Sequence, residues 1–238
     1  MAYLKTLKFN KDMGMNTRVL ELFDNVNIIS ANNGGGKTIL LRSLYDLLNR
    51  NDPKYQPAYL SIETTEGQKF EYFCEKKDEP ITVGERINDV FVRFYDKYDY
   101  NTAMGLKERY KASFETIASQ YYNNFTDDYG ILRDEMERFE GALDVLNKIS
   151  PSLDCNMKLC NMSSGELKLF CLFMIAYSGD CDSKGVVLLD NFDDHLDMDT
   201  SEKVLSMITQ VNKNNQYIVS ALKPITVTGW QDRVFSLN

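Results

Sequence analysis

Histidine is almost absent from this sequence: His195 is the only one among 238 residues, so a zinc site is not expected. The five cysteines include no CxxC pair, and their odd number argues against a disulfide framework. No apolar run is long enough to span a bilayer, and residues 1–5 lack the pattern of a signal peptide. These absences predict a cytoplasmic protein without membrane insertion.

Positive charge is also scarce. The chain has 27 Lys and Arg residues against 35 Asp and Glu, a net charge of −8, whereas surfaces that coat nucleic acid are usually basic. The rest of the composition is typical of a globular protein, because 43% of the residues are hydrophobic and 12% are aromatic. The length suits one large domain or one and a half, with enough chain to bury a core.

Glycine is concentrated in residues 31–38, which read Ala-Asn-Asn-Gly-Gly-Gly-Lys-Thr. A short apolar run, residues 26–29, precedes this stretch, and residues 39–48 follow it with apolar side chains at helical spacing. Strand, glycine-rich turn and helix are the context of a phosphate-binding P-loop, in which the lysine reaches the β- and γ-phosphates and the hydroxyl holds Mg²⁺. We therefore predict a nucleoside triphosphate site. It is formed by Asn32, Asn33, Gly34, Gly35, Gly36, Lys37 and Thr38, with Ala31 where a leading glycine is usual.

The segments around this stretch alternate between strand and helix patterns. Before residue 101, strands are predicted at residues 3–9, 18–23, 58–63, 69–75 and 90–95, with a turn-rich hairpin connection at 64–67. Residues 103–149 carry apolar stripes at helical spacing and predict an antiparallel helical pair. After it come a buried strand at 185–190, a helix at about 201–213, and strands at 217–220 and near 233–235. This order predicts an α/β fold with parallel strands at the centre of a sheet.

Three motifs occur in the order of one family. The stretch Ser163-Ser164-Gly165-Glu166 opens an apolar segment, and residues 190–197 read Asp-Asn-Phe-Asp-Asp-His-Leu-Asp after a buried strand. With residues 31–38, they resemble the signature motif, the Walker B motif with its D-loop, and the Walker A motif of ABC-type ATPases. The Gly-Glu ending of the signature is closest in style to SMC, RecF-like and defence-associated soluble ATPases. Taken alone, the Ser-Ser-Gly-Glu stretch would be an ordinary helix N-cap, and the order of motifs favours the signature.

The resemblance implies a P-loop NTPase fold with N-terminal antiparallel strands, a mixed or parallel core sheet and an inserted helical lobe. The corresponding division is residues 1–101 for the strands and P-loop, 102–150 for the lobe and 151–238 for the remaining core. It also implies ATP and Mg²⁺ as cofactors, with the metal held by Thr38 and Asp190. Asp96 is a candidate third metal contact, because it follows the strand where the family has its glutamine-bearing Q-loop.

The family's dimer would place the second half of the site on another subunit. Ser163, Ser164, Gly165 and Glu166 would contact the γ-phosphate held by the P-loop of the opposite head, and Asp197 in the D-loop would lie near this interface. ATP would then bridge two heads in a head-to-tail dimer, formed by two copies of this chain or by this chain and a related ATPase subunit. The resemblance also implies an effector protein whose action the dimer controls.

Two catalytic residues of the family are missing. Asn191 follows Asp190 where a glutamate usually polarises the attacking water, and an amide cannot take up a proton at neutral pH. The segment Ser220-Ala221-Leu222 lacks the switch histidine, while Asp193, Asp194 and Lys223 are candidates to compensate. With Lys37, Asp190 and Asn191 as the catalytic set, we expect sound ATP binding and slow or partner-dependent hydrolysis.

Three functions fit these observations. The first is an ATP-gated dimerisation switch in DNA maintenance or anti-phage defence. The second is a nucleotide sensor without meaningful turnover, and the third is a transporter's nucleotide-binding subunit, which the Gly-Glu signature disfavours. Nucleic acid could contact Lys107, Arg109 and Lys111, although acidic residues 134, 135, 137 and 140 on the neighbouring helix argue against a continuous basic face.

Overall fold

The computed structural model describes residues 2–12, 16–74, 80–88, 90, 92–95, 165, 169, 172, 185–194, 196–211, 213–222 and 231–237. The chain divides into two compact units. The first comprises Met1–Lys97, Asp180–Asp194 and Asn212–Asn238, and the second comprises Tyr98–Gly179 and His195–Val211. The predicted helical lobe at 102–150 lies outside the described residues, and the division into three segments stays a prediction.

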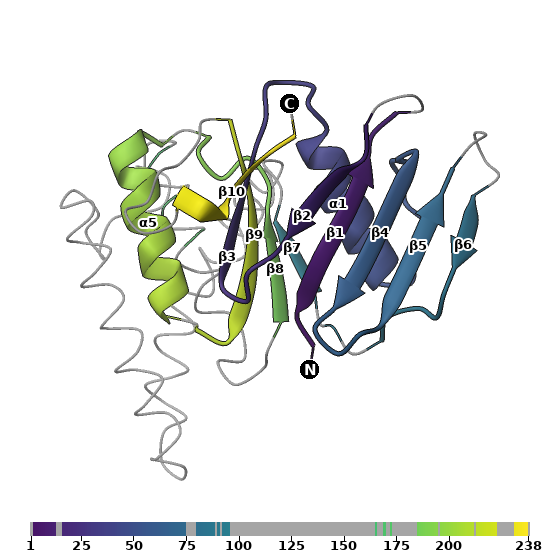
Figure 1. The fold of residues 1–238 in the computed structure, drawn as a ribbon. Helices are drawn as coiled ribbons and strands as arrows, with labels where there is room; N and C mark the ends of the chain where they lie inside the picture. Colours follow the sequence, from purple (N-terminus) through teal and green to yellow (C-terminus); the bar gives the residue numbers. More distant parts are fainter. Residues whose placement is uncertain are drawn as a thin grey trace, which may run out of the picture. The chain divides into compact units, whose positions relative to one another are not determined.

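One sheet of the first unit is antiparallel and has the strand order β2-β1-β4-β5-β6 (Figure 1). Its strands are β1 (Leu4–Asn10), β2 (Arg18–Glu21), β4 (Tyr59–Thr64), β5 (Lys69–Phe73) and β6 (Ile81–Val83). The hairpin between β4 and β5 is confirmed, and its turn uses Gly67 at φ 83° with a hydrogen bond from Thr64 N–H to the Gln68 carbonyl (2.9 Å). Strand β6 was not predicted, because three residues are too few for a periodicity to be visible.

The second sheet of this unit is parallel throughout, in the order β10-β3-β9-β8-β7 (Figure 1). Its strands are β3 (Val26–Ser30), β7 (Val92–Tyr95), β8 (Gly185–Leu189), β9 (Asn215–Ala221) and β10 (Val234–Ser236). A short 3₁₀ turn, η2 (Gln231–Arg233), leads into β10. Every residue of β8 and β9 is buried, as expected for the central strands of a parallel sheet. The predicted α/β fold with a parallel core sheet and N-terminal antiparallel strands is confirmed.

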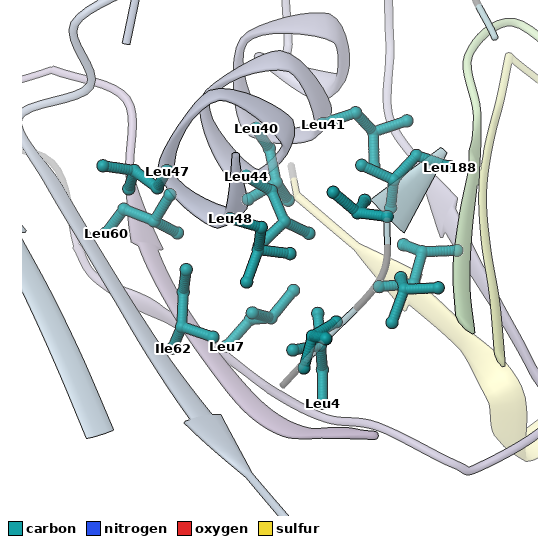
Figure 2. Close-up of a cluster of buried hydrophobic side chains, with 14 of the residues drawn as sticks. Leu4, Leu7, Leu40, Leu41, Leu44, Leu47, Leu48, Leu60, Ile62 and Leu188 are labelled. Carbon is teal, nitrogen blue, oxygen red and sulfur yellow. The ribbon is translucent and has the colours of Figure 1, made fainter. Parts of the chain in front are cut away.

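Helix α1 (Lys37–Leu48) shares one core with both sheets. Its apolar side chains recur every three or four residues, so they form one buried stripe, Leu40, Leu41, Leu44, Leu47 and Leu48. Figure 2 shows Leu47 beside Leu60 of the antiparallel sheet and Leu41 pointing toward Leu188 of the parallel sheet. The helix that follows the glycine-rich turn is therefore anchored between the two sheets.

A buried glutamine joins the two sheets near the start of β9 and the start of β1. Gln216 on β9 is fully buried, and its Oε1 accepts a hydrogen bond from Leu4 N–H on β1 (2.9 Å). Its Nε2 donates to the Leu4 carbonyl (2.7 Å) and to the Phe23 carbonyl (2.8 Å). One side chain thus makes hydrogen bonds to three backbone groups, and the Phe23 carbonyl also accepts from Asn27 Nδ2 (2.8 Å).

In the second unit, α5 (Met198–Val211) begins three residues earlier than the predicted start at residue 201. The early start follows from Asp197, whose Oδ1 accepts a hydrogen bond from Thr200 N–H (2.9 Å) and so caps the helix. Gly165, Leu169 and Leu172 are helical. None of the helices among the described residues is long and apolar enough to cross a membrane.

Candidate functional site

The glycine-rich turn connects the end of β3 to the start of α1, as predicted. Gly34 has φ 81° and Gly36 has φ 93°, which side-chain-bearing residues rarely adopt. A Cβ atom on Gly36 would also lie 3.3 Å from both Lys11 Cδ and Phe9 Cε1. Ala31, by contrast, is buried and has no positive φ, so an alanine fits where the motif usually begins with glycine.

Lys37 begins α1 with only 6% of its surface exposed. Its Nζ donates to the backbone carbonyls of Ala31 (2.5 Å) and Asn32 (3.3 Å). Burial lowers the pKa of Lys37, while the carboxylates of Asp190 and Asp193 raise it. The ammonium group therefore lies under the loop that is predicted to bind phosphate, with two carboxylates close enough to influence it.

The central contact of the site joins residues that are 152 positions apart. Thr38 Oγ1 donates to Asp190 Oδ2 over 2.7 Å. Asp190 directly follows β8 and is 2% exposed, and Thr38 lies in the first turn of α1. Because parallel strands present their carboxyl ends at one edge of the sheet, the P-loop and the end of β8 meet there.

A magnesium ion fits this pair of oxygens. Mg²⁺ prefers oxygen ligands, and in phosphate sites it takes one or two protein contacts together with waters and substrate phosphates. Thr38 and Asp190 supply one hydroxyl and one carboxylate at the phosphate-binding turn. Within the described residues, no group of three or more His, Cys, Asp and Glu side chains is arranged to hold a metal ion. The geometry suits a cation shared with a nucleotide.

Asn191 follows Asp190 in a turn and has φ 49°, in the left-handed region. Its backbone N–H donates to Ser220 Oγ (2.8 Å), and its amide Nδ2 lies 3.3 Å from Asp190 Oδ2. Ser220 Oγ in turn donates to Asp190 Oδ1 (2.5 Å). Sequence reasoning considered the Ser220 region only for a missing histidine, so it missed this contact. The pairing of Leu189 with Val219 on the adjacent strands is what places residues 190 and 220 together.

The end of β9 is tied to the turn that follows Asn191. Leu222 N–H donates to both carboxylate oxygens of Asp193 (3.0 and 3.1 Å), and Asp194 N–H donates to the Asn191 carbonyl (3.1 Å). The Leu222 side chain is 41% exposed. Asp193 is therefore the candidate substitute that the structure brings to the site, since its charge also acts on Lys37.

Lys11 is a second cation at the P-loop that sequence reasoning did not assign. It follows β1, and its Nζ donates to the Gly34 carbonyl (2.9 Å) and lies 3.7 Å from Asp12 Oδ2. A lysine in a loop between two strands has no recognisable spacing to the glycine-rich turn. Only the tertiary contact between Lys11, after β1, and the glycine-rich turn before α1 reveals it.

The other predicted residues either fall outside the described residues or belong to the second unit. Asp96, Ser163, Ser164, Glu166, His195 and Lys223 are outside the described residues. Gly165 is helical and half-buried in the second unit. Asp197 is exposed, and besides capping α5 its Oδ2 accepts a hydrogen bond from Thr200 Oγ1 (2.6 Å). These hydrogen bonds lower the pKa of Asp197. The roles of all these residues in binding a nucleotide stay predictions.

Solved structures with a similar fold include heads of Smc proteins. An Smc head bound to the C-winged helix domain of ScpA has a TM-score of 0.62 at 14% identity, covering 98% of this chain and 94% of that chain. A Pyrococcus furiosus Smc head with an extended coiled coil, bound to the C-terminal domain of ScpA, has a TM-score of 0.57 at 14% identity, covering 94% and 91%. The SMC head domain from Thermotoga maritima has a TM-score of 0.54 at 16% identity, covering 93% and 90%. At these identities the likeness concerns the fold.

No curated protein matches this chain, but a family model matches nearly all of it. The RecF/RecN/SMC N terminal domain matches residues 3–237, a span that contains the P-loop, Asp190 and the end of β9. The order of these parts along the chain, the Thr38–Asp190 contact and the Smc-like fold agree with this match. The chain belongs to the RecF/RecN/SMC N-terminal domain family of ABC-type P-loop ATPases.

Proposed function

We propose that this ATPase head binds Mg²⁺-ATP and dimerises head to tail around it, with slow or partner-dependent hydrolysis, to gate an effector. The observation that carries the proposal is the 2.7 Å contact between Thr38 and Asp190, because it brings two predicted Mg²⁺ ligands together from distant parts of the chain. Family membership supports ATP as the nucleotide.

Binding of the phosphates begins with a change of partners at Lys37. Its Nζ exchanges the carbonyls of Ala31 and Asn32 for phosphate oxygens, which hold a cation more strongly than neutral carbonyls do. The N-terminus of α1 adds backbone N–H groups and the positive end of its dipole. Thr38 and Asp190 hold Mg²⁺, which supplies charge neutralisation at the β- and γ-phosphates.

Dimerisation completes the site from a second subunit. Ser163, Ser164, Gly165 and Glu166 of one head contact the γ-phosphate held by the other, with Asp197 near the interface. The partner head is a second copy of this chain or a related ATPase subunit. ATP favours the dimer because it binds that state more tightly than the separate heads.

Slow turnover follows from the residue after Asp190. Asn191 carries no carboxylate to polarise water, and the segment Ser220-Ala221-Leu222 lacks the switch histidine that the family resemblance implies. Asn191 also favours a second candidate function, a nucleotide sensor that binds ATP and stays in the ATP-bound state without hydrolysis. The two candidates share the binding step and differ in whether phosphate is released.

The effector is a separate protein, in a pathway of DNA maintenance or anti-phage defence. Two Smc heads of similar fold are bound to domains of ScpA, which supports a protein partner for this head as well. Nucleic acid is the alternative partner to a separate effector protein.

The test measures molar mass in solution with and without Mg²⁺-ATP, while phosphate release is followed in the same sample. A doubled mass with little phosphate supports the locked switch, and a doubled mass with steady release supports an ATPase cycle. Lys37→Ala is the control and abolishes both responses. An unchanged mass with ATP bound would disprove the homodimer and direct the search to a related subunit.

A further inference from the structure

Ser220 is a fully buried hydroxyl at the edge of the sheet where the site lies. It is the last but one residue of β9, between Val219 and Ala221, and its exposed fraction is 0%. Because Leu189 pairs with Val219 on the adjacent parallel strand, the next residues, Asp190 and Ser220, are neighbours. A buried hydroxyl needs hydrogen-bond partners, and here both partners belong to the turn after β8.

The hydroxyl makes two directed contacts. Ser220 Oγ donates to Asp190 Oδ1 over 2.5 Å and accepts the backbone N–H of Asn191 over 2.8 Å. The other carboxylate oxygen, Asp190 Oδ2, accepts from Thr38 Oγ1 (2.7 Å) and lies 3.3 Å from the Asn191 amide nitrogen. Both oxygens of Asp190 are thus oriented by named donors, so the carboxylate cannot rotate without losing hydrogen bonds.

We propose that Ser220 and Asn191 are positioning residues that hold the Asp190 carboxylate in the orientation needed to bind Mg²⁺. The inference rests on the proposed function, in which Asp190 and Thr38 hold the metal of bound ATP. It assigns residue 191 a role in retaining nucleotide, in place of water activation. Partners of this kind, one shell away from a metal, orient the ligating oxygen and tune its affinity.

The backbone at residue 191 supports this assignment. Asn191 adopts φ 49°, and asparagine tolerates the left-handed region better than most residues with a side chain. The contact from its N–H to Ser220 holds it in that conformation.

The experiment measures how much Mg²⁺ is needed for tight binding of a fluorescent ATP analogue to the full chain. Ser220→Ala is expected to raise the Mg²⁺ concentration for half-maximal binding about tenfold. Binding of the analogue in EDTA is expected to change less than about twofold, since the P-loop and Lys37 are untouched. Ser220→Thr keeps the hydroxyl and should stay close to wild type.

Ser43→Ala is the matched control. Ser43 is also fully buried, but its Oγ donates to the Tyr55 carbonyl (2.7 Å), outside the metal contacts. Ser43→Ala should leave the Mg²⁺ requirement unchanged even if it lowers thermal stability. Equal effects of the two serine variants would overturn the proposal, as would an equal loss of binding with and without Mg²⁺ in Ser220→Ala.

Asn191→Gly tests the proposal independently, even if Ser220→Ala fails to fold. Glycine keeps the left-handed backbone and removes the amide, so the Mg²⁺ requirement should rise about threefold. No rise in this variant would disprove the role of Asn191. A wild-type chain that binds no ATP analogue at all would instead disprove the proposed function, so the two failures are distinguishable.

Discussion

The two sheets of the first unit differ in how they bury their strands. In the parallel sheet, all five residues of β8 and all seven of β9 are buried. In the antiparallel sheet, β5 alternates between buried and less buried residues, and all three residues of β6 are exposed, with Ile81 at 57% and Val83 at 51%. A sheet buried on both faces offers only its ends to a ligand, and the candidate site lies at such an end.

The comparison teaches where the functional groups come from. Asp190, Asn191 and Ser220 all lie at the carboxyl ends of parallel strands, and Thr38 lies on the helix packed against that sheet. The antiparallel sheet borders the site through Phe9 of β1 and through Lys11, which follows β1. We expect substitutions in the parallel sheet to affect both stability and ATP binding, and substitutions in the antiparallel sheet to affect mainly stability.

The largest contrast in stability is expected between two isoleucines. Ile218→Ala on β9 removes a side chain with 0% exposure and should lower the free energy of unfolding by about 2–5 kcal/mol. Ile81→Ala on β6 should change it by no more than about 0.5 kcal/mol. Urea unfolding of both variants measures the difference. Similar losses would mean that β6 is covered in the native protein.

The junction between the sheets is expected to be the next most sensitive point. Gln216→Leu removes the side-chain partner of the Leu4 N–H and carbonyl, and one of two donors to the Phe23 carbonyl. It should destabilise the protein by about 3 kcal/mol. Gln56→Leu, at an exposed glutamine, is the control and should cost no more than about 0.5 kcal/mol. A small loss for Gln216→Leu would indicate that water replaces its hydrogen bonds.

Two lysines compare the contributions of the sheets to ATP binding. Lys37→Ala removes a buried cation and should weaken binding of an ATP analogue about a hundredfold or more. Lys11→Ala removes a more exposed cation from the other sheet and should weaken binding no more than about fivefold. Fluorescence titration in Mg²⁺ measures both. Equal losses would contradict the view that the antiparallel sheet only borders the site.

The smallest effect is expected at the cap of α5, outside both sheets. Asp197→Ala should cost about 1 kcal/mol, whereas Asp197→Asn keeps an acceptor for Thr200 N–H and should cost less. Because hydrogen bonds lower the pKa of Asp197 in the folded state, its contribution is present above the unfolded value of about 4 and is lost as the pH falls through the folded value. Unfolding curves at neutral and acidic pH test this sign.

The variants Asp197→Ala and Asp197→Asn also distinguish the capping role of Asp197 from its predicted role in the D-loop. If Asp197→Asn keeps full stability but abolishes the change of mass with ATP, the carboxylate acts at the dimer interface. If both variants dimerise like wild type, Asp197 is a cap alone.

Local sequence was sufficient for the P-loop. Its glycines, Lys37 and Thr38 are contiguous, and the strand before them and the helix after them show their own periodicities, so the whole element could be predicted within about twenty residues. Asp190 at the end of an apolar run is a weak signal by itself, and it could be predicted only together with the P-loop and the order of the motifs. The start of α5 was missed because capping by Asp197 depends on side-chain geometry at the helix end.

Tertiary structure alone decided which side chains complete the site. Ser220 reaches Asp190 because of the register between β8 and β9, and Lys11 reaches Gly34 because β1 lies near the turn that begins α1. Neither contact leaves a trace in spacing, since the partners are 30 and 23 residues apart. Motifs record interactions that adjacent residues share with a ligand, whereas the orientation of a carboxylate depends on which strands become neighbours when the core is buried.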